Sequence, residues 1–340
     1  MKVLVTGATG FLGGALTTAL IRERQEVRIL ARKTSILDKL TNLPIDIRFG
    51  CLEDKASLGS VLEGIEYVYH CAALSSDWGS WDDFYKSNVQ GVKNLLEAAQ
   101  EAGSVQRFIH ISTSDVYGYP IHVVDESHPI KEIGLPYNRT KVLGEKAVWD
   151  FYKKMGLPIT VIRPVTLYGP RSLSIVVEFA AVLLKKQMVL IDGGHIPAGL
   201  LYIDNAVEGI LQAALSPKTI GQAYNLRDES NETWHQFISA LAKGIDVGFP
   251  RMTIPSNLAL GIAYISEIIY RMMNIKKRPL FSRHVIYFLC RDQGFPIKKA
   301  QQDFGYRSKV GFAEGMERTL TWLASEEGKR ALSHKLNNPK

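Results

Sequence analysis

Residues 3–13 read VLVTGATGFLG, a short β-rich run that leads directly into three glycines and the start of an apolar helix. A helix amino terminus exposes unpaired N–H groups and the positive end of the helix dipole, so it suits a bound pyrophosphate. Glycines are needed there because the backbone must turn sharply, approach the phosphates and pack against the strand. The placement of Gly7, Gly10 and Gly13 therefore predicts a dinucleotide-binding turn. The alternative is a tight turn without a ligand.

Strands and helices alternate beyond this turn. β-rich apolar runs lie at 27–31, 45–49, 67–72, 108–112 and 159–165, and helical patterns lie at 11–24, 89–101 and 136–155. This alternation indicates crossover units around a parallel sheet. We therefore expect an α/β fold with a doubly wound parallel (Rossmann) sheet. The dinucleotide-binding domain spans 1–170, with its sheet completed by 200–226, and residues 171–340 mainly form a smaller substrate-binding cap.

The composition is that of an ordinary globular protein. The 340 residues are 46% hydrophobic and 22% charged, which sets aside disordered and collagen-like chains and allows one large or two coupled domains. The three cysteines, Cys51, Cys71 and Cys290, are too few and too scattered for a disulfide framework or a zinc site. No stretch has the pattern of a leader or a membrane-crossing helix, so we expect a cytoplasmic protein. We expect no metal site and no nucleic-acid partner, because no metal-ligand motif and no basic–aromatic module is present.

The end of the second strand indicates which nucleotide the turn binds. An acidic residue here binds the ribose 2′-hydroxyl of NAD, whereas a basic residue accommodates the 2′-phosphate of NADP. The run 27–31 ends in Arg32 and Lys33, with no carboxylate nearby. NADP(H) is therefore favoured over NAD(H), with Arg32 and Lys33 on the phosphate. The alternative is that Arg32 stacks on the adenine while NAD binds.

Tyr137 and Lys141 lie one turn apart at the start of the predicted helix 136–155, which has Pro136 at its first position. They share one helix face with small and apolar residues. A lysine on such a face is costly to bury unless its charge is paired or has a function. A free phenol has a pKa of about 10, and a neighbouring ammonium favours the phenolate and lowers that pKa. We therefore expect Tyr137 to act as general acid or base toward a carbonyl or alcohol. The alternative is a surface lysine beside a packed tyrosine.

Together these motifs resemble the extended short-chain dehydrogenase/reductase family. The Gly-x-x-Gly-x-x-Gly spacing matches the family fingerprint over Thr6–Gly13, and the similarity runs from residue 2 to about 230. The resemblance implies that Tyr137 and Lys141 are catalytic, that Lys141 also holds the nicotinamide ribose, and that Asn88 lies near the active site. The cofactor-binding residues expected from the motifs and the resemblance are Gly7, Thr9, Gly10, Phe11, Leu12, Gly13, Arg32, Lys33, Leu52, Ala72, Ala73, Tyr137, Lys141, Pro164 and Val165.

The resemblance also implies a third catalytic group, a hydroxyl residue three places before the valine of Val116-Tyr117-Gly118, which is Thr113. Its hydroxyl can polarise the substrate oxygen. Ser112 and Ser114 are the alternatives, with Ser112 expected on the other face of the strand. A cluster of hydroxyls at a strand end is often only a capping turn. Cys51 stands where the family has an aspartate that contacts the adenine.

Within the family, the resemblance is closest to the 3β-hydroxysteroid dehydrogenase-like and dihydroflavonol reductase-like branch. Thr113 is not followed by the acid pair of the 4,6-dehydratases, and Ala198 stands where nucleotide-sugar enzymes have a diphosphate-binding arginine. We therefore expect an NADP(H)-dependent oxidoreductase that acts on a secondary alcohol or ketone of an apolar or steroid-like molecule, with Asn88 supporting a proton relay. The alternatives are a nucleotide-sugar epimerase or dehydratase with tightly bound NAD, and a cofactor-sensing protein without turnover.

The region from Arg251 onward is basic, with 16 Lys or Arg against 7 Asp or Glu. It contains an apolar helix predicted at 257–273, followed by Lys276, Lys277 and Arg278. Three interpretations remain open: a core helix of the second domain, a roof over an apolar pocket, or a peripheral membrane contact with the cations on lipid phosphates. The resemblance also implies a homodimer, because many relatives pair through helices.

Overall fold

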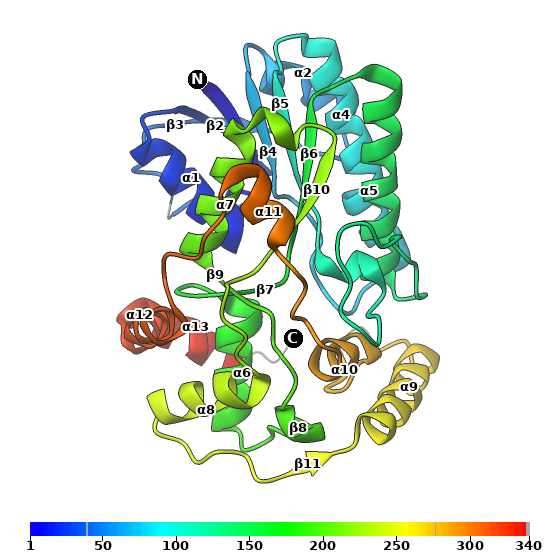
Figure 1. The fold of residues 1–340 in the computed structure, drawn as a ribbon, viewed down its shortest axis with the longest axis vertical. Coiled ribbons are helices and arrows are strands. Elements are labelled where there is room, and N and C mark those ends of the chain that lie inside the picture. The colour runs from blue at the N-terminus through cyan, green and yellow to red at the C-terminus, as the bar shows by residue number, and fades with distance from the viewer. Residues whose placement is uncertain (39, 276, 338–340) are drawn as a thin grey trace.

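The computed structural model describes residues 1–38, 40–275 and 277–337. Its centre is a parallel seven-stranded sheet of order β10-β6-β5-β4-β1-β2-β3 (Figure 1). The strand order reverses between β1 and β4, which places a crevice at their carboxyl ends, where α/β sheets bind ligands. The strands are β1 (Lys2–Thr6), β2 (Glu26–Ala31), β3 (Ile45–Phe49), β4 (Tyr67–His70), β5 (Arg107–Ile111), β6 (Ile159–Pro164) and β10 (Gln222–Leu226).

Helices cover both faces of this sheet. β5 and β6 are buried at every position, as expected for apolar strands between two helical layers. Helices α2 (Gly59–Leu62), α4 (Gly91–Ala102) and α5 (Pro136–Met155) pack on one face, and α1 (Phe11–Arg22) and α7 (Ile203–Leu215) pack on the other (Figure 1). The predicted doubly wound parallel sheet is confirmed.

Most elements begin and end close to their predicted bounds. Helix α5 spans the predicted residues, with Pro136 at its first position and Gly156 (φ 70°) ending it. The main difference is the helix predicted at 89–101, which begins earlier, because the π-helical turn Lys86–Gln90 leads directly into α4. That turn follows α3 (Trp81–Tyr85).

A second layer lies beyond the carboxyl edge of the sheet (Figure 1). Of the stretch 200–226, β10 joins the central sheet, whereas β9 (Leu200–Tyr202) pairs with β7 (Thr166–Tyr168) in a separate ladder. A further ladder pairs β8 (Leu190–Ile191) with β11 (Thr253–Ile254). In the described residues, no helix combines the length and apolar character needed to cross a membrane. The remaining helices are α6 (Glu178–Leu184), α8 (Trp234–Gly244), α9 (Ser256–Met272), α10 (Arg283–Cys290), α11 (Lys298–Phe304), α12 (Phe312–Ala324) and α13 (Glu326–Asn337).

Candidate active site

The glycine turn after β1 has the shape that a pyrophosphate requires. Gly7 adopts a φ of +74°, and a Cβ there would lie 2.7 Å from the backbone nitrogen of Ala72. A Cβ at Gly13 would collide with the carbonyl oxygen of Gly7, so α1 can approach the turn this closely only with glycine. Gly10 begins α1 without a side-chain cap, which leaves the N–H groups of the first turn for a ligand. These features fit a dinucleotide.

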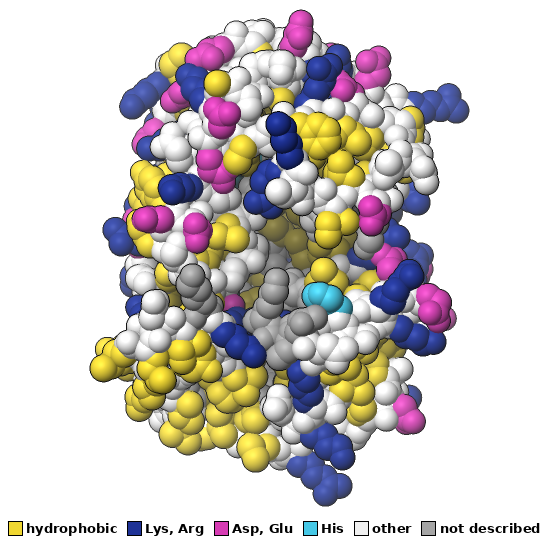
Figure 2. All heavy atoms as spheres, turned by 180° about the vertical axis from the view of Figure 1, so that it is seen from behind, with side chains coloured by type: hydrophobic (Ala, Val, Ile, Leu, Met, Phe, Trp, Pro, Cys, Tyr) yellow, Lys and Arg dark blue, Asp and Glu magenta, His cyan; other side chains and the backbone are white. Residues whose placement is uncertain are grey.

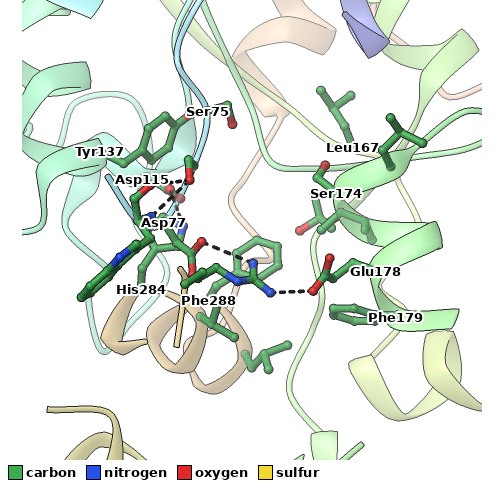
Figure 3. Close-up of a pocket in the computed structure, with 18 of the residues that line it drawn as sticks. Ser75, Asp77, Asp115, Tyr137, Leu167, Ser174, Glu178, Phe179, His284 and Phe288 are labelled. Carbon is green, nitrogen blue, oxygen red and sulfur yellow. Dashed lines mark hydrogen bonds and ion pairs between the residues drawn. The ribbon is translucent and has the colours of Figure 1, made fainter. Parts of the chain in front are cut away.

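A cavity of about 1250 Å³ begins at this turn and extends along the carboxyl edge of the sheet into the cap. Figure 3 shows its centre, with Tyr137 and Asp115 on one side and Leu167, Ser174 and Glu178 on the other. Of the predicted site residues, those that line it are Gly10, Phe11, Leu12, Ala73, Thr113, Tyr137, Lys141, Pro164 and Val165. Those outside its lining are Gly7, Thr9, Gly13, Arg32, Lys33, Leu52, Ala72 and Asn88.

The residues expected near the adenosine end lie at the edge of the sheet formed by β2 and β3. Arg32 and Lys33 are exposed directly after β2, and the backbone N–H of Arg32 donates to Ser35 Oγ at 3.1 Å. Leu52 is buried, and its carbonyl oxygen accepts from Asn94 Nδ2 at 2.8 Å. The thiol of Cys51, where the family has an aspartate, donates to the carboxylate of Glu53. The carboxylate of Glu53 therefore lies close to the position at which the family has its aspartate.

Tyr137 lies in the first turn of α5, and its ring meets the ring of His284 edge-on, with 5.6 Å between centroids. Burial raises the pKa of Tyr137, and the charge of Asp115 raises it further, while hydrogen bonds with Ser75 and Thr113 lower it. The pKa of Tyr137 is therefore raised overall. The sequence predicts a lowered pKa, and this direction is wrong for the protein alone, because helical spacing reveals neither the burial of the phenol nor the carboxylate beside it.

Lys141 points away from solvent, toward the end of β5. Its Nζ donates to the carbonyl oxygen of Ile111 at 2.9 Å. Burial lowers the pKa of Lys141 to about 8, against the opposing charges of Glu145, Cys71 and Asp115. A buried cation with a single backbone partner is costly, which is expected of a group whose further partner is a bound ligand.

The depressed pKa of Lys141 predicts a pH dependence of stability. Between pH 8 and 10.5 the unfolded chain holds this proton and the folded chain releases it, so the free energy of unfolding rises with pH, by up to about 1.4 kcal/mol per pH unit. Urea unfolding of Lys141→Met should lack this rise. Lys146→Met, on the exposed face of the same helix, serves as the control and should keep it. Equal pH slopes for both variants would contradict the buried, depressed lysine.

The hydroxyl residues that follow β5 have different hydrogen-bond partners. Ser112 lines the cavity, and its Oγ donates to the buried carboxylate of Glu145 at 2.6 Å. Thr113 lines the cavity, and its Oγ also accepts from the backbone N–H of Asp115 at 3.2 Å. Ser114 is buried. Thr113 is thus placed both to cap the short turn Ser114–Tyr117 and to face a ligand.

Asn88 is buried beneath the loop that follows β4. Its Oδ1 accepts from the N–H of Leu74 at 2.8 Å, and its Nδ2 donates to the carbonyl of Leu74 and to Thr140 Oγ. A Cβ at Gly144 would collide with the carbonyl oxygen of Asn88, so α5 lies directly against this turn. Asn88 therefore ties the loop at 71–78 to α5, and its side chain does not reach the cavity wall.

The structure adds residues that the sequence does not indicate. Asp115 is buried in the cavity wall, where burial raises its pKa, and its Oδ2 lies 3.7 Å from His284 Nε2. His284 comes from α10, and its Nδ1 lies 3.4 Å from the hydroxyl of Tyr119. Asp115 stands in the motif around Thr113, so its place could have been found. His284 lies more than 140 residues later in the chain, and no local pattern marks it.

An ion network crosses the cavity between the two layers (Figure 3). The guanidinium of Arg278 binds Asp77 at 3.3 Å and Glu178 at 2.5 Å. Ser282 Oγ donates to Asp77 at 2.6 Å, and Lys335 Nζ binds Glu178 at 2.5 Å. Asp77 belongs to the loop after β4 and Glu178 to α6. The network therefore joins the loop after β4 to α6 across the cavity.

Comparisons with known proteins agree with this arrangement. Residues 3–226 match the model of the NAD dependent epimerase/dehydratase family. A 4-hydroxy-2-methyl-3-oxo-4-farnesyl-3,4-dihydroquinoline-1-oxide ketoreductase of Stigmatella aurantiaca is 28% identical over 338 residues, 98% of this chain and 100% of the relative. The sterol-4-alpha-carboxylate 3-dehydrogenase, decarboxylating, of Mus musculus is 26% identical over 94% of this chain and 90% of the relative.

Solved structures share the fold. The UDP-glucuronic acid 4-epimerase of Bacillus cereus in complex with NAD matches with a TM-score of 0.76 at 23% identity, over 98% of this chain and 100% of that one. The resemblance to extended short-chain dehydrogenases is confirmed by the family match and the relatives. The chain therefore belongs to the NAD dependent epimerase/dehydratase family, as an NAD(P)-dependent enzyme of the extended short-chain dehydrogenase/reductase type.

Proposed function

We propose that the protein is an NADP(H)-dependent oxidoreductase that interconverts a secondary alcohol and a ketone on an apolar or steroid-like small molecule. The observation that carries this proposal is the one cavity that joins the uncapped amino end of α1 to Thr113, Tyr137 and Lys141. Bound NADP(H) supplies or accepts the hydride. The glycine turn and the N–H groups of α1 would hold its pyrophosphate, and Ala73, Pro164 and Val165 would lie beside its nicotinamide.

In this proposal Tyr137 donates the proton to the ketone oxygen, or removes it from the alcohol in the reverse direction. Its raised pKa keeps the hydroxyl protonated, which suits the donor role. Thr113 donates a second hydrogen bond to the same oxygen. Lys141 would bind the ribose hydroxyls, the partner that its buried ammonium requires. Asn88 acts indirectly, by holding the loop at 71–78 against α5.

The cavity wall supports an apolar substrate. Two of the cations that line it, Arg278 and Lys335, are paired with the carboxylate of Glu178. The names of the two relatives, a farnesyl-quinoline ketoreductase and a sterol dehydrogenase, point to the same class of substrate. The apolar residues that line the cap side are Leu167, Leu173, Ile175, Phe179, Val182, Met188, Leu280, Phe281 and Phe288.

The second candidate function is a nucleotide-sugar epimerase with tightly bound NAD. The fold of the UDP-glucuronic acid 4-epimerase supports it. The position at which such enzymes have a diphosphate-binding arginine is Ala198 in this chain, and it is fully buried. An alanine in this place gives the diphosphate no charged partner, so the reductase is favoured.

An assay of the purified protein distinguishes the two functions. We expect NADPH to be consumed in step with alcohol formed from apolar cyclic or branched ketones, and UDP-sugars to be left unchanged. Interconversion of UDP-sugars without net use of NADPH, by protein that retains nicotinamide through purification, would contradict the proposal.

The cofactor preference predicts the effect of Arg32→Asp. The exposed guanidinium at the end of β2 would pair with the 2′-phosphate, a charge-assisted bond whose loss should weaken NADPH binding about 10- to 100-fold. NADH binding should change little or improve, since the new carboxylate can accept from the 2′-hydroxyl. Fluorescence titration with each nucleotide gives the ratio of the NADPH and NADH dissociation constants. Arg22→Asp, at the other end of α1, is the matched control, and equal affinity of the unmodified protein for NADPH and NADH would refute the preference.

A further inference from the structure

Helix α9 exposes its large apolar side chains and buries small ones, the reverse of the usual pattern of a surface helix. The positions that face the protein are Ala259, Ala263 and Glu267, spaced four residues apart. The large side chains point outward and are 40% to 81% exposed. Figure 2 shows hydrophobic side chains gathered over this corner of the molecule. These residues, here named the α9 apolar face, are Leu258, Ile262, Tyr264, Ile265, Ile268, Ile269, Met272 and Met273.

The contacts of α9 hold this face outward. Glu267 accepts from the backbone N–H of Arg283 at 2.7 Å and from its Nε at 2.9 Å. The Arg283 guanidinium also lies 5.2 Å from the centroid of the Tyr264 ring. Ala259 and Ala263 pack with Ile286 of α10. The small residues thus let α9 lie close to α10, and a buried ion pair fixes its rotation.

The charges around the face are mostly positive. Between residues 251 and 280 the sequence has a single carboxylate, Glu267, which is buried and paired with Arg283. Exposed cations lie on and beside α9 at Arg251, Arg271 and Lys277, while Lys276 lies outside the described residues. The exposed carboxylate of Asp192 accepts from the backbone N–H of Ser256 at the amino end of α9. The face is therefore an exposed apolar stripe with more flanking cations than acids, which complements an anionic lipid surface.

We propose that the α9 apolar face docks on the surface of an anionic membrane, with the helix lying in the interfacial plane. A second copy of the chain fits less well. In a twofold pairing both partners bring the same net-positive rim to the interface, whereas an anionic surface complements it.

Helix α9 also contacts the wall of the cavity. Trp78 lines the cavity, and its ring meets that of Tyr270 of α9 edge-on, with 6.1 Å between centroids. Leu280 and Phe281, in the segment between α9 and α10, also line the cavity. Docking through α9 would therefore bring the rim of the cavity to the lipid surface, from which an apolar molecule can enter.

The test is flotation of the full chain with vesicles of phosphatidylcholine, with and without phosphatidylglycerol. We expect binding to the phosphatidylglycerol vesicles, weakened about tenfold or more in the double variant Ile265→Gln, Ile269→Gln, which removes two half-exposed apolar side chains. Arg271→Gln with Lys277→Gln should weaken binding to these vesicles and reduce its dependence on salt. Both pairs lie on the surface, so the variants should remain folded.

The matched control is Leu215→Gln with Met155→Gln, two exposed apolar residues at the ends of α7 and α5. This control should bind like the unmodified protein. Equal binding by the Ile265→Gln, Ile269→Gln variant would overturn the proposal, as would an absence of vesicle binding. Dimers of the unmodified protein in sedimentation, lost in that variant, would assign the face to a second copy instead.

Discussion

Replacing Tyr137 with phenylalanine should lower turnover of an apolar ketone by about 10²- to 10⁴-fold, the usual contribution of a positioned general acid. The ring remains against His284 and Phe84, so the apolar contacts persist and only the hydroxyl is lost. Because this hydroxyl would donate the proton to the substrate oxygen, the loss should fall on kcat. The measurement is steady-state NADPH oxidation with the substrate near saturation.

The controls for this variant separate chemistry from binding. NADPH affinity should change by less than about threefold, because the pyrophosphate turn lies on α1 and not on α5. Tyr152→Phe removes a hydroxyl from the same helix four turns away from the site, and it should keep the turnover of the unmodified protein. Full activity in Tyr137→Phe would mean that another group, with Asp115 and His284 the nearest candidates, transfers the proton.

Replacing Glu145 with alanine should lower the free energy of unfolding by about 3–5 kcal/mol. Glu145 is fully buried on α5, where its carboxylate accepts from Arg163 through two nitrogens and from Ser112 and Trp149. Removal of the carboxylate leaves the Arg163 guanidinium without its counter-ion inside the protein. The hydrogen bond of Arg163 to the Tyr117 hydroxyl at 2.8 Å cannot replace that charge.

Urea unfolding of the cofactor-free protein measures this effect. Glu132→Ala, which removes the carboxylate of an exposed pair with Arg139 and Lys146 on the same helix, should cost less than about 1 kcal/mol. If Glu145→Ala were no less stable than Glu132→Ala, the buried pair would not hold α5 to β6. The prediction bears on function, because α5 carries Tyr137 and Lys141 and Ser112 precedes Thr113.

The sequence predicts the dinucleotide-binding layer well because local chemistry determines it. Glycine is required at Gly7 and Gly13 by backbone geometry alone, and Pro136 and Gly156 define the ends of α5. The alternation of apolar and helical runs then leaves few topologies for the sheet. Each of these signals lies within a few residues of the feature that it predicts.

The cap and the electrostatics of the site could not be predicted in this way. His284 reaches the cavity only because α10 folds back over the carboxyl edge of the sheet, a long-range placement that no spacing encodes. The pKa of Tyr137 depends on burial and on Asp115, neither of which is visible in the Tyr-x-x-x-Lys spacing. The apolar run at 257–273 likewise shows a helix but not which of its faces is covered.

The central claim is that the Tyr137 hydroxyl gives its proton to the substrate oxygen. The most direct measurement is the crystal structure of the complex with NADP⁺ and an apolar alcohol product. The account predicts a distance of about 2.6–3.2 Å from Tyr137 Oη to the alcohol oxygen, with Thr113 Oγ on the same atom. An alcohol oxygen bound instead by His284 or Asp115, beyond the reach of Tyr137, would contradict it.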